Sequence, residues 1–103
     1  MKTKGKSSES NSIYFIEGNR LTNDSIRIVA STLRRYGIAV GQVPHKTTLK
    51  LERSAEMSWK TFLRLLKKFI QPKIGSLILF SCSTGKVFIC NNTGNRPNLF
   101  IEQ

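Results

Sequence analysis

Cationic residues recur with helical spacing in the second half of the chain: Lys60, Arg64, Lys67 and Lys68. Steps of four, three and one residues place all of them on one face of an α-helix. Ammonium and guanidinium groups in such a row neutralise phosphates, so the pattern is typical of contact with a nucleic-acid backbone. A solvated helix face usually mixes both signs, yet no acidic residue occurs between Glu56 and Glu102. We expect this face to bind phosphate, with a merely solubilising face as the alternative.

Further cations extend the predicted phosphate-binding surface: Arg27, Arg34, Arg35, Lys73 and Lys86. The chain has 103 residues, with 17 Lys and Arg against six Asp and Glu, and its net charge is +11. An excess of this size favours a polyanionic partner, and we expect nucleic acid, RNA or DNA. Because phosphate contacts carry no base information, specificity is expected to be low or based on shape.

Three residues are candidates for catalysis: Glu17, Asp24 and His45. A metal-dependent nuclease needs several carboxylates around its divalent ions, and the chain has only six acidic residues. The single histidine lies beside Pro44 and Lys46 in a predicted turn, with no second acid in view for metal-free cleavage of RNA. We therefore expect no catalysis, no metal and no cofactor, and keep a small metal-dependent nuclease as an alternative.

The two cysteines, Cys82 and Cys90, do not have the close pairing typical of zinc sites, so we expect two buried free thiols. No stretch approaches the roughly 20 apolar residues that a membrane-spanning helix needs. The N-terminus shows no apolar run of the kind found in signal peptides. These features predict a soluble cytoplasmic protein without a membrane partner.

The composition predicts three segments. Residues 1–12 are rich in Lys and Ser, which predicts a disordered basic tail. Residues 13–92 carry the apolar periodicity of a single α+β domain, and residues 93–103 are expected to form a C-terminal extension.

Within the domain, strands are expected at Ile13–Glu17, Ile38–Val43, Thr47–Arg53, Leu77–Ser81 and Val87–Cys90. Helices are expected at Asp24–Tyr36, with Asn23 as N-cap and Gly37 as terminator, and from Trp59 until Pro72 stops it, with Ser58 as N-cap. The order β α β β α β with an extra C-terminal strand forming a hairpin predicts a ferredoxin-like plait. Its second sheet face would be open to a tail, a subunit or a ligand.

The run Ile13-Tyr14-Phe15-Ile16, followed by Gly18-Asn19, resembles the first-strand signature of RNA-recognition motif domains. The resemblance implies aromatic side chains that stack on bases across the open sheet face. The family's second signature requires Gly and aromatic residues on the third strand, and Thr47–Arg53 has neither. One of Tyr14 and Phe15 must point away from the helices, because strand side chains alternate.

The predicted topology and size are also similar to those of the small nucleases of CRISPR adaptation. That family places an aspartate at the end of its first strand, where this chain has Glu17. Without the aspartate, we expect Glu17 to pair with a nearby cation such as Arg20.

Three functions are therefore open. The first is a non-enzymatic module that binds nucleic acid through the cationic helix face. The second is an interaction subunit of a nucleic-acid-processing assembly, with a protein partner or self-association through the C-terminal hairpin, as the apolar run Leu99-Phe100-Ile101 suggests. The third is the nuclease that would use Glu17, Asp24 or His45.

Overall fold

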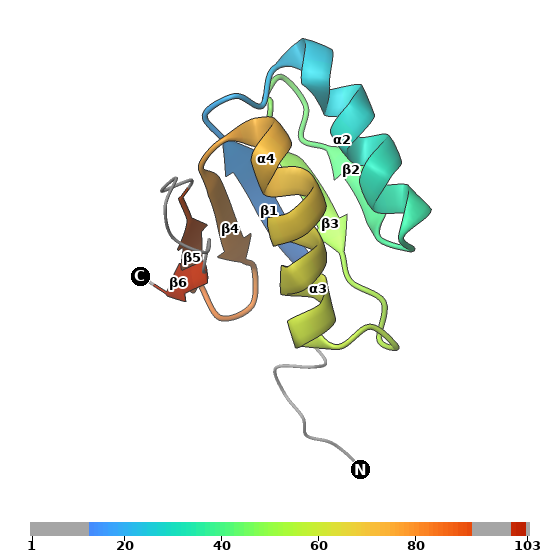
Figure 1. Ribbon diagram of the computed structural model, residues 1–103, viewed down its shortest axis with the longest axis vertical. Helices are drawn as coiled ribbons and strands as arrows, with labels where there is room; N and C mark the ends of the chain where they lie inside the picture. The colour runs from blue at the N-terminus through green and yellow to red at the C-terminus, as the bar shows by residue number, and fades with distance from the viewer. Residues whose placement is uncertain (1–12, 92–99, 103) are drawn as a thin grey trace.

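The computed structural model describes residues 13–91 and 100–102, which form an α+β structure (Figure 1). Its strands are β1 (Ile13–Gly18), β2 (Ala39–Gln42), β3 (Leu49–Glu52), β4 (Leu77–Ser81), β5 (Val87–Cys90) and β6 (Phe100–Glu102). Its helices are α2 (Asn23–Arg35) and a continuous helical stretch made of α3 (Trp59–Leu65), the π-helix η1 (Leu66–Ile70) and α4 (Gln71–Ile74). The predicted tail at residues 1–12 lies outside the described residues, as do residues 92–99 and 103.

The strands form one antiparallel sheet in the order β2-β3-β1-β4-β5-β6. Both helical stretches lie on the same side of this sheet (Figure 1). The predicted α+β class is confirmed. The sheet has six strands where five were expected, because Phe100–Glu102, within the predicted C-terminal extension, pairs with β5. No described helix is long and apolar enough to cross a membrane.

Alternation along the strands separates a covered face from an open one. Tyr14 and Ile16 are buried against the helices, whereas Phe15 and Glu17 point to the other face. The prediction that one of the two β1 aromatics points away from the helices is confirmed, and the one that does is Phe15. The hydrophobic core lies on the helix side of the sheet.

An aromatic cluster fixes α3 on the sheet. The ring of Phe62 is fully buried and lies 5.1 Å from that of Tyr14. The Trp59 ring lies 5.4 Å from Tyr14 and 5.3 Å from Phe88 on β5. Burial of rings in such packing contributes several kcal/mol. The cluster therefore sets which flank of α3 faces β5 and β6.

Both helices begin at side-chain caps. The Ser58 hydroxyl accepts a hydrogen bond from the Thr61 amide at 3.1 Å, so the predicted cap of the second helix is confirmed. The cap predicted for α2 is wrong, because Thr22 holds that position in place of Asn23. Thr22 and Ser25 form a reciprocal capping box, at 3.3 and 2.9 Å, which draws Asn23 into the first helical turn.

The predicted stop at Pro72 is also wrong, since the helical stretch continues to Ile74. Pro72 follows η1 and occupies the first turn of α4. Proline has no amide hydrogen, so Pro72 donates no backbone hydrogen bond to the preceding turn, yet the helical stretch carries on past it to Ile74. The helix ends at Gly75, whose φ is +75°.

Hydrogen bonds join two loops that lie at the same end of the core, just beyond the end of α4. The Arg20 amide donates to the Ile74 carbonyl at 3.0 Å, and the Ser76 amide donates to Asn19 Oδ1 at 2.9 Å. These bonds tie the β1–α2 loop to the α4–β4 loop, so that α4 and the start of α2 form one rigid end.

Candidate nucleic-acid interface

Three of the predicted phosphate ligands line one hollow of about 340 Å³, together with two apolar residues: Lys60, Leu63, Arg64, Lys67 and Phe100. The hollow lies where α3 and η1 face β6. None of the described residues that line it is acidic. We call Lys60, Arg64 and Lys67 the cationic cluster.

The cationic cluster carries uncompensated charge. Within residues 13–91 and 100–102, no ion pair joins any of its members to an acidic residue. Burial raises the pKa of the Cys90 thiol, and the nearby Lys67 ammonium opposes that rise. Lys67 therefore lies near Cys90 on β5. Positive charge in a concave surface concentrates the field and attracts anions.

Lys68 does not belong to the cationic cluster. Its ammonium lies 5.5 Å from the centre of the Phe69 ring, and Phe69 stacks on Tyr36 beyond the end of α2 at 4.9 Å. This side chain therefore extends toward α2 and away from β6. The sequence prediction placed it on the same helix face as Lys67, but neighbouring residues of an α-helix differ by about 100° in direction, so the two side chains leave the helix on different sides.

The predicted arginines of α2 lie apart from the cationic cluster. Arg27 and Arg34 line a different hollow, of about 350 Å³, between α2 and β2. The Arg34 guanidinium also donates to the Val40 carbonyl at 2.8 Å, which ties α2 to β2. Arg35, in the last turn of α2, is exposed.

The last two predicted ligands also lie outside the hollow. Lys73 is exposed on α4. Lys86 pairs with Glu102 at 3.4 Å, which compensates part of its charge. The structure thus brings three of the nine predicted residues into one hollow and distributes the other six over the surface.

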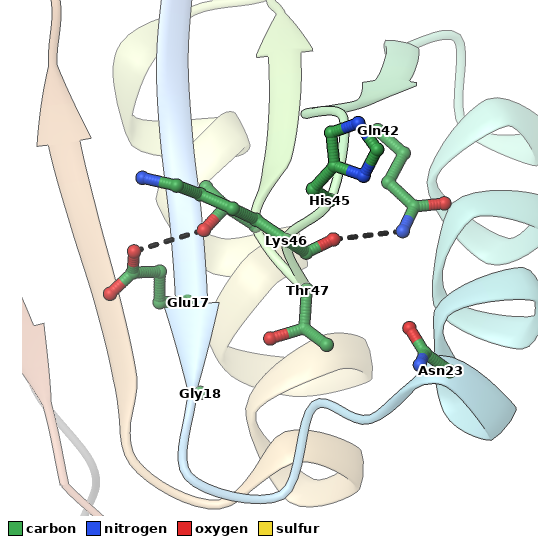
Figure 2. A pocket seen from close by; sticks show the side chains of 8 residues that line it. Glu17, Gly18, Asn23, Gln42, His45, Lys46 and Thr47 are labelled. Atoms are coloured by element: carbon green, nitrogen blue, oxygen red, sulfur yellow. Dashed lines mark hydrogen bonds between the residues drawn. The ribbon is translucent and has the colours of Figure 1, made fainter.

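A second, polar hollow of about 600 Å³ lies at the end of β1 (Figure 2), lined by Glu17, Gly18, Asn23, Gln42, His45, Lys46, Thr47 and Thr48. Its walls come from β1, the start of α2 and the β2–β3 turn. Two hydrogen bonds order it: Thr48 Oγ1 donates to Glu17 Oε2 at 3.0 Å, and Gln42 Nε2 donates to the Lys46 carbonyl at 2.8 Å.

This polar hollow collects two of the three candidate catalytic residues. The Glu17 carboxylate and the His45 ring lie on opposite sides of Lys46 and do not converge on one point (Figure 2). His45 is an exposed turn residue with a φ of +65°. General acid–base catalysis requires both groups within reach of the same reacting atoms. The observed arrangement lacks that convergence.

The structure also bears on the predictions about Glu17, metal binding and the two cysteines. Glu17 is held by Thr48, and Arg20 donates instead to the Pro72 carbonyl at 3.2 Å, so the predicted pairing of the two is wrong. Among the described residues, no group of three or more His, Cys, Asp or Glu side chains is placed to hold a metal ion. Cys90 is buried as expected, whereas Cys82 is exposed because it follows β4 in the β4–β5 turn.

The open face of the sheet carries one of the aromatics that the resemblance to RNA-recognition motifs singled out. Phe15 pairs in register with Phe80 on β4 and with Lys50 on β3. On the open face, the aromatic neighbour of Phe15 therefore lies on β4, and its neighbour on β3 is a lysine. A hollow of about 330 Å³ lies over these strands, with Phe15, Ile78, Phe80 and Val87 in its walls.

Sequence reasoning missed the apolar part of the cationic hollow. Phe100 lies in a segment that predicted only an extension, and its place beside η1 depends on the pairing of β6 with β5. The apolar run at residues 99–101 was the only signal that pointed to it. Comparison of the chain with protein-family models, with curated proteins and with solved structures gives no match.

Proposed function

We propose that this protein binds nucleic acid through the cationic cluster, without catalysis, and that its phosphate contacts are made in the hollow between α3, η1 and β6. The observation that carries the proposal is the convergence of Lys60, Arg64 and Lys67 on one hollow, whose described lining holds no acidic residue. Three cations in a concave surface match the spaced negative charges of a backbone.

The rest of the molecule supports the same partner. With a net charge of +11, the whole chain attracts a polyanion and speeds the encounter. The exposed cations outside the hollow, such as Arg35 and Lys73, add to this field without a defined contact. Binding through phosphates alone predicts affinity for RNA and DNA with little sequence preference.

We further propose that the strands β2-β3-β1-β4 with their two helices represent a ferredoxin-like plait, and that β5 and β6 are an addition to it. The addition has a functional consequence. It extends the sheet past α3, so that β6 provides the second wall of the cationic hollow.

Charge reversal tests the proposal. Replacement of Lys60, Arg64 and Lys67 by Glu lowers the net charge by two units per residue, from +11 to +5. A matched control makes the same change at Arg27, Arg35 and Lys73, which are exposed outside the hollow. We expect the cluster variant to lose binding of labelled RNA and DNA, and the control to keep most of it. Equal losses in both variants would show that overall charge, and not this hollow, carries the binding.

An interaction subunit is the second candidate, because the same hollow suits the carboxylates of an acidic protein as well as phosphates. Binding of an acidic polypeptide such as polyglutamate, measured beside a single-stranded oligonucleotide of equal charge, separates the two. Tighter binding of the polypeptide would favour the subunit.

A further inference from the structure

The open face of the sheet carries a contiguous apolar surface over β1, β4, β5 and β6. Registered partners on neighbouring strands point to the same face, and the pairs are Phe15 with Phe80, Phe80 with Val87, Ile78 with Ile89, and Ile89 with Ile101. We call these six side chains the open-face block. Ile78, Phe80 and Ile101 are 36%, 40% and 59% exposed.

No described helix covers this block, since both helical stretches lie on the other side of the sheet (Figure 1). Single exposed apolar residues are ordinary, but a contiguous set on a sheet usually marks an interaction surface. Residues 1–12 and 92–99, which lie outside the described residues, have too few apolar side chains to cover the block. Residues 1–12 hold no large apolar residue after Met1, and residues 92–99 hold only Leu99.

The charges around the block indicate what kind of partner it fits. Among the residues that the structure describes, the charged ones on the open face are two acids and two bases: Glu17, Lys46, Lys50 and Glu52. Their sum is zero, although the chain as a whole carries +11. A polyanion gains little from such a surface. An isologous contact requires self-complementarity, which an apolar centre with equal numbers of both charges provides.

We propose that the open face binds the open face of a second copy of this chain, so that two sheets pack against each other with the open-face block at the centre. A stable interface needs about 800 Å² of surface from each partner. The six partly buried side chains of the open-face block supply less than this. The charged residues on β1 and β3 therefore form its rim. The cationic clusters of both copies lie on the outer, helix-covered sides, where the repulsion between them is weakest.

The salt dependence of such a dimer differs in sign from that of nucleic-acid binding. An apolar interface between two positively charged chains is held or strengthened by salt, because screening weakens their mutual repulsion. Binding to phosphates falls steeply with salt. This difference makes the dimer testable on its own, in the absence of nucleic acid.

Sedimentation velocity of the full-length, nuclease-treated protein tests the proposal. The variants are Phe80→Glu at the centre of the block and Ile101→Glu at its edge, where a substitution disturbs the core least. Ile28→Glu is the matched control, because Ile28 is 57% exposed on α2, on the helix side. Circular dichroism reports whether each variant folds.

We expect the unmodified chain and the Ile28 variant to sediment as dimers at low and high salt. The Phe80 and Ile101 variants should associate at least tenfold more weakly while remaining folded. Charge reversal of the cationic cluster should leave the dimer intact, so failure of the proposed function and failure of this inference are distinguishable.

Three results would overturn the inference. The first is a monomer at every soluble concentration, both for the full-length protein and for a variant that lacks residues 1–12. The second is a dimer that weakens with salt and resists both block substitutions. The third is a monomer whose Phe80 variant loses binding to single-stranded oligonucleotides, which would assign the face to base stacking.

Discussion

Substitution of Gly75 by alanine tests the account of how the rigid end of the molecule is joined. Gly75 ends α4 with a φ of +75°, and an added Cβ would overlap the side-chain oxygen of Asn19. Gly37 ends α2 with a φ of +87°, and an added Cβ there meets nothing within 4 Å. Both glycines therefore oppose alanine through a positive φ. Gly75 differs in its ψ of −134°, which lies outside the left-handed helical region, and in the overlap.

The expected losses of stability follow from the backbone conformation and from the overlap with Asn19. Alanine at a positive φ costs about 1–2 kcal/mol at Gly37 and about 1–3 kcal/mol at Gly75, where ψ is −134°. At Gly75, Asn19 must also leave the Ser76 amide, whose hydrogen bond measures 2.9 Å, and such a bond contributes about 0.5–1.5 kcal/mol. We expect Gly75→Ala to lower the free energy of unfolding by about 1.5–4.5 kcal/mol and Gly37→Ala by about 1–2 kcal/mol.

Urea unfolding followed by the fluorescence of Trp59 provides the measurement, since Trp59 is the only tryptophan and packs on Tyr14 and Phe88. A double-mutant cycle isolates the overlap. In an Asn19→Ala background, the further cost of Gly75→Ala should fall by the part that comes from the overlap, about 0.5–1.5 kcal/mol. Equal costs at both glycines in the unmodified chain, or an unchanged cost without the Asn19 side chain, would refute the reasoning.

Three further predictions concern the packing and the thiols around the cationic cluster. Phe62→Ala should lower the free energy of unfolding by about 3–5 kcal/mol, because Phe62 is fully buried; urea unfolding checks it, and a cost under about 1 kcal/mol would contradict the packing described. Cys82 should react with a thiol reagent in the native protein and Cys90 only after unfolding. Because burial raises the pKa of Cys90, its contribution to stability is complete below the ordinary thiol pKa and is lost as pH rises through the raised value. In a Cys82→Ser background, Lys67→Met should raise this pKa further, so the loss of stability measured by urea unfolding should begin at higher pH, and an unchanged or lowered midpoint of that loss would place Lys67 elsewhere.

Local signals predicted most of the secondary structure. The Ser58 cap and the Gly37 stop are short-range features, and alternation on β1 correctly separated Tyr14 from Phe15. The errors came where two local signals competed. Thr22 and Asn23 are both good caps, and the reciprocal bond with Ser25 decided between them.

The site was less predictable, because it depends on contacts between distant segments. Helical period alone grouped Lys60, Arg64 and Lys67, but it could not show that Lys68 lies over the Phe69 ring instead of in their hollow. The position of α2 beside β2 placed its arginines far from this group. Likewise, the wall formed by Phe100 required the pairing of β6, which has no local signature.

The most direct test of the central claim is the salt dependence of nucleic-acid binding, measured with neutral substitutions. Each phosphate contact contributes about 0.9 to the slope of log affinity against log salt on duplex DNA, so three contacts contribute about 2.7. Replacement of Lys60, Arg64 and Lys67 by Gln should lower the magnitude of the slope by about that amount. The same change at Arg27, Arg35 and Lys73 should leave the slope nearly unchanged. A cluster variant with the slope of the unmodified protein would show that these residues do not contact phosphate.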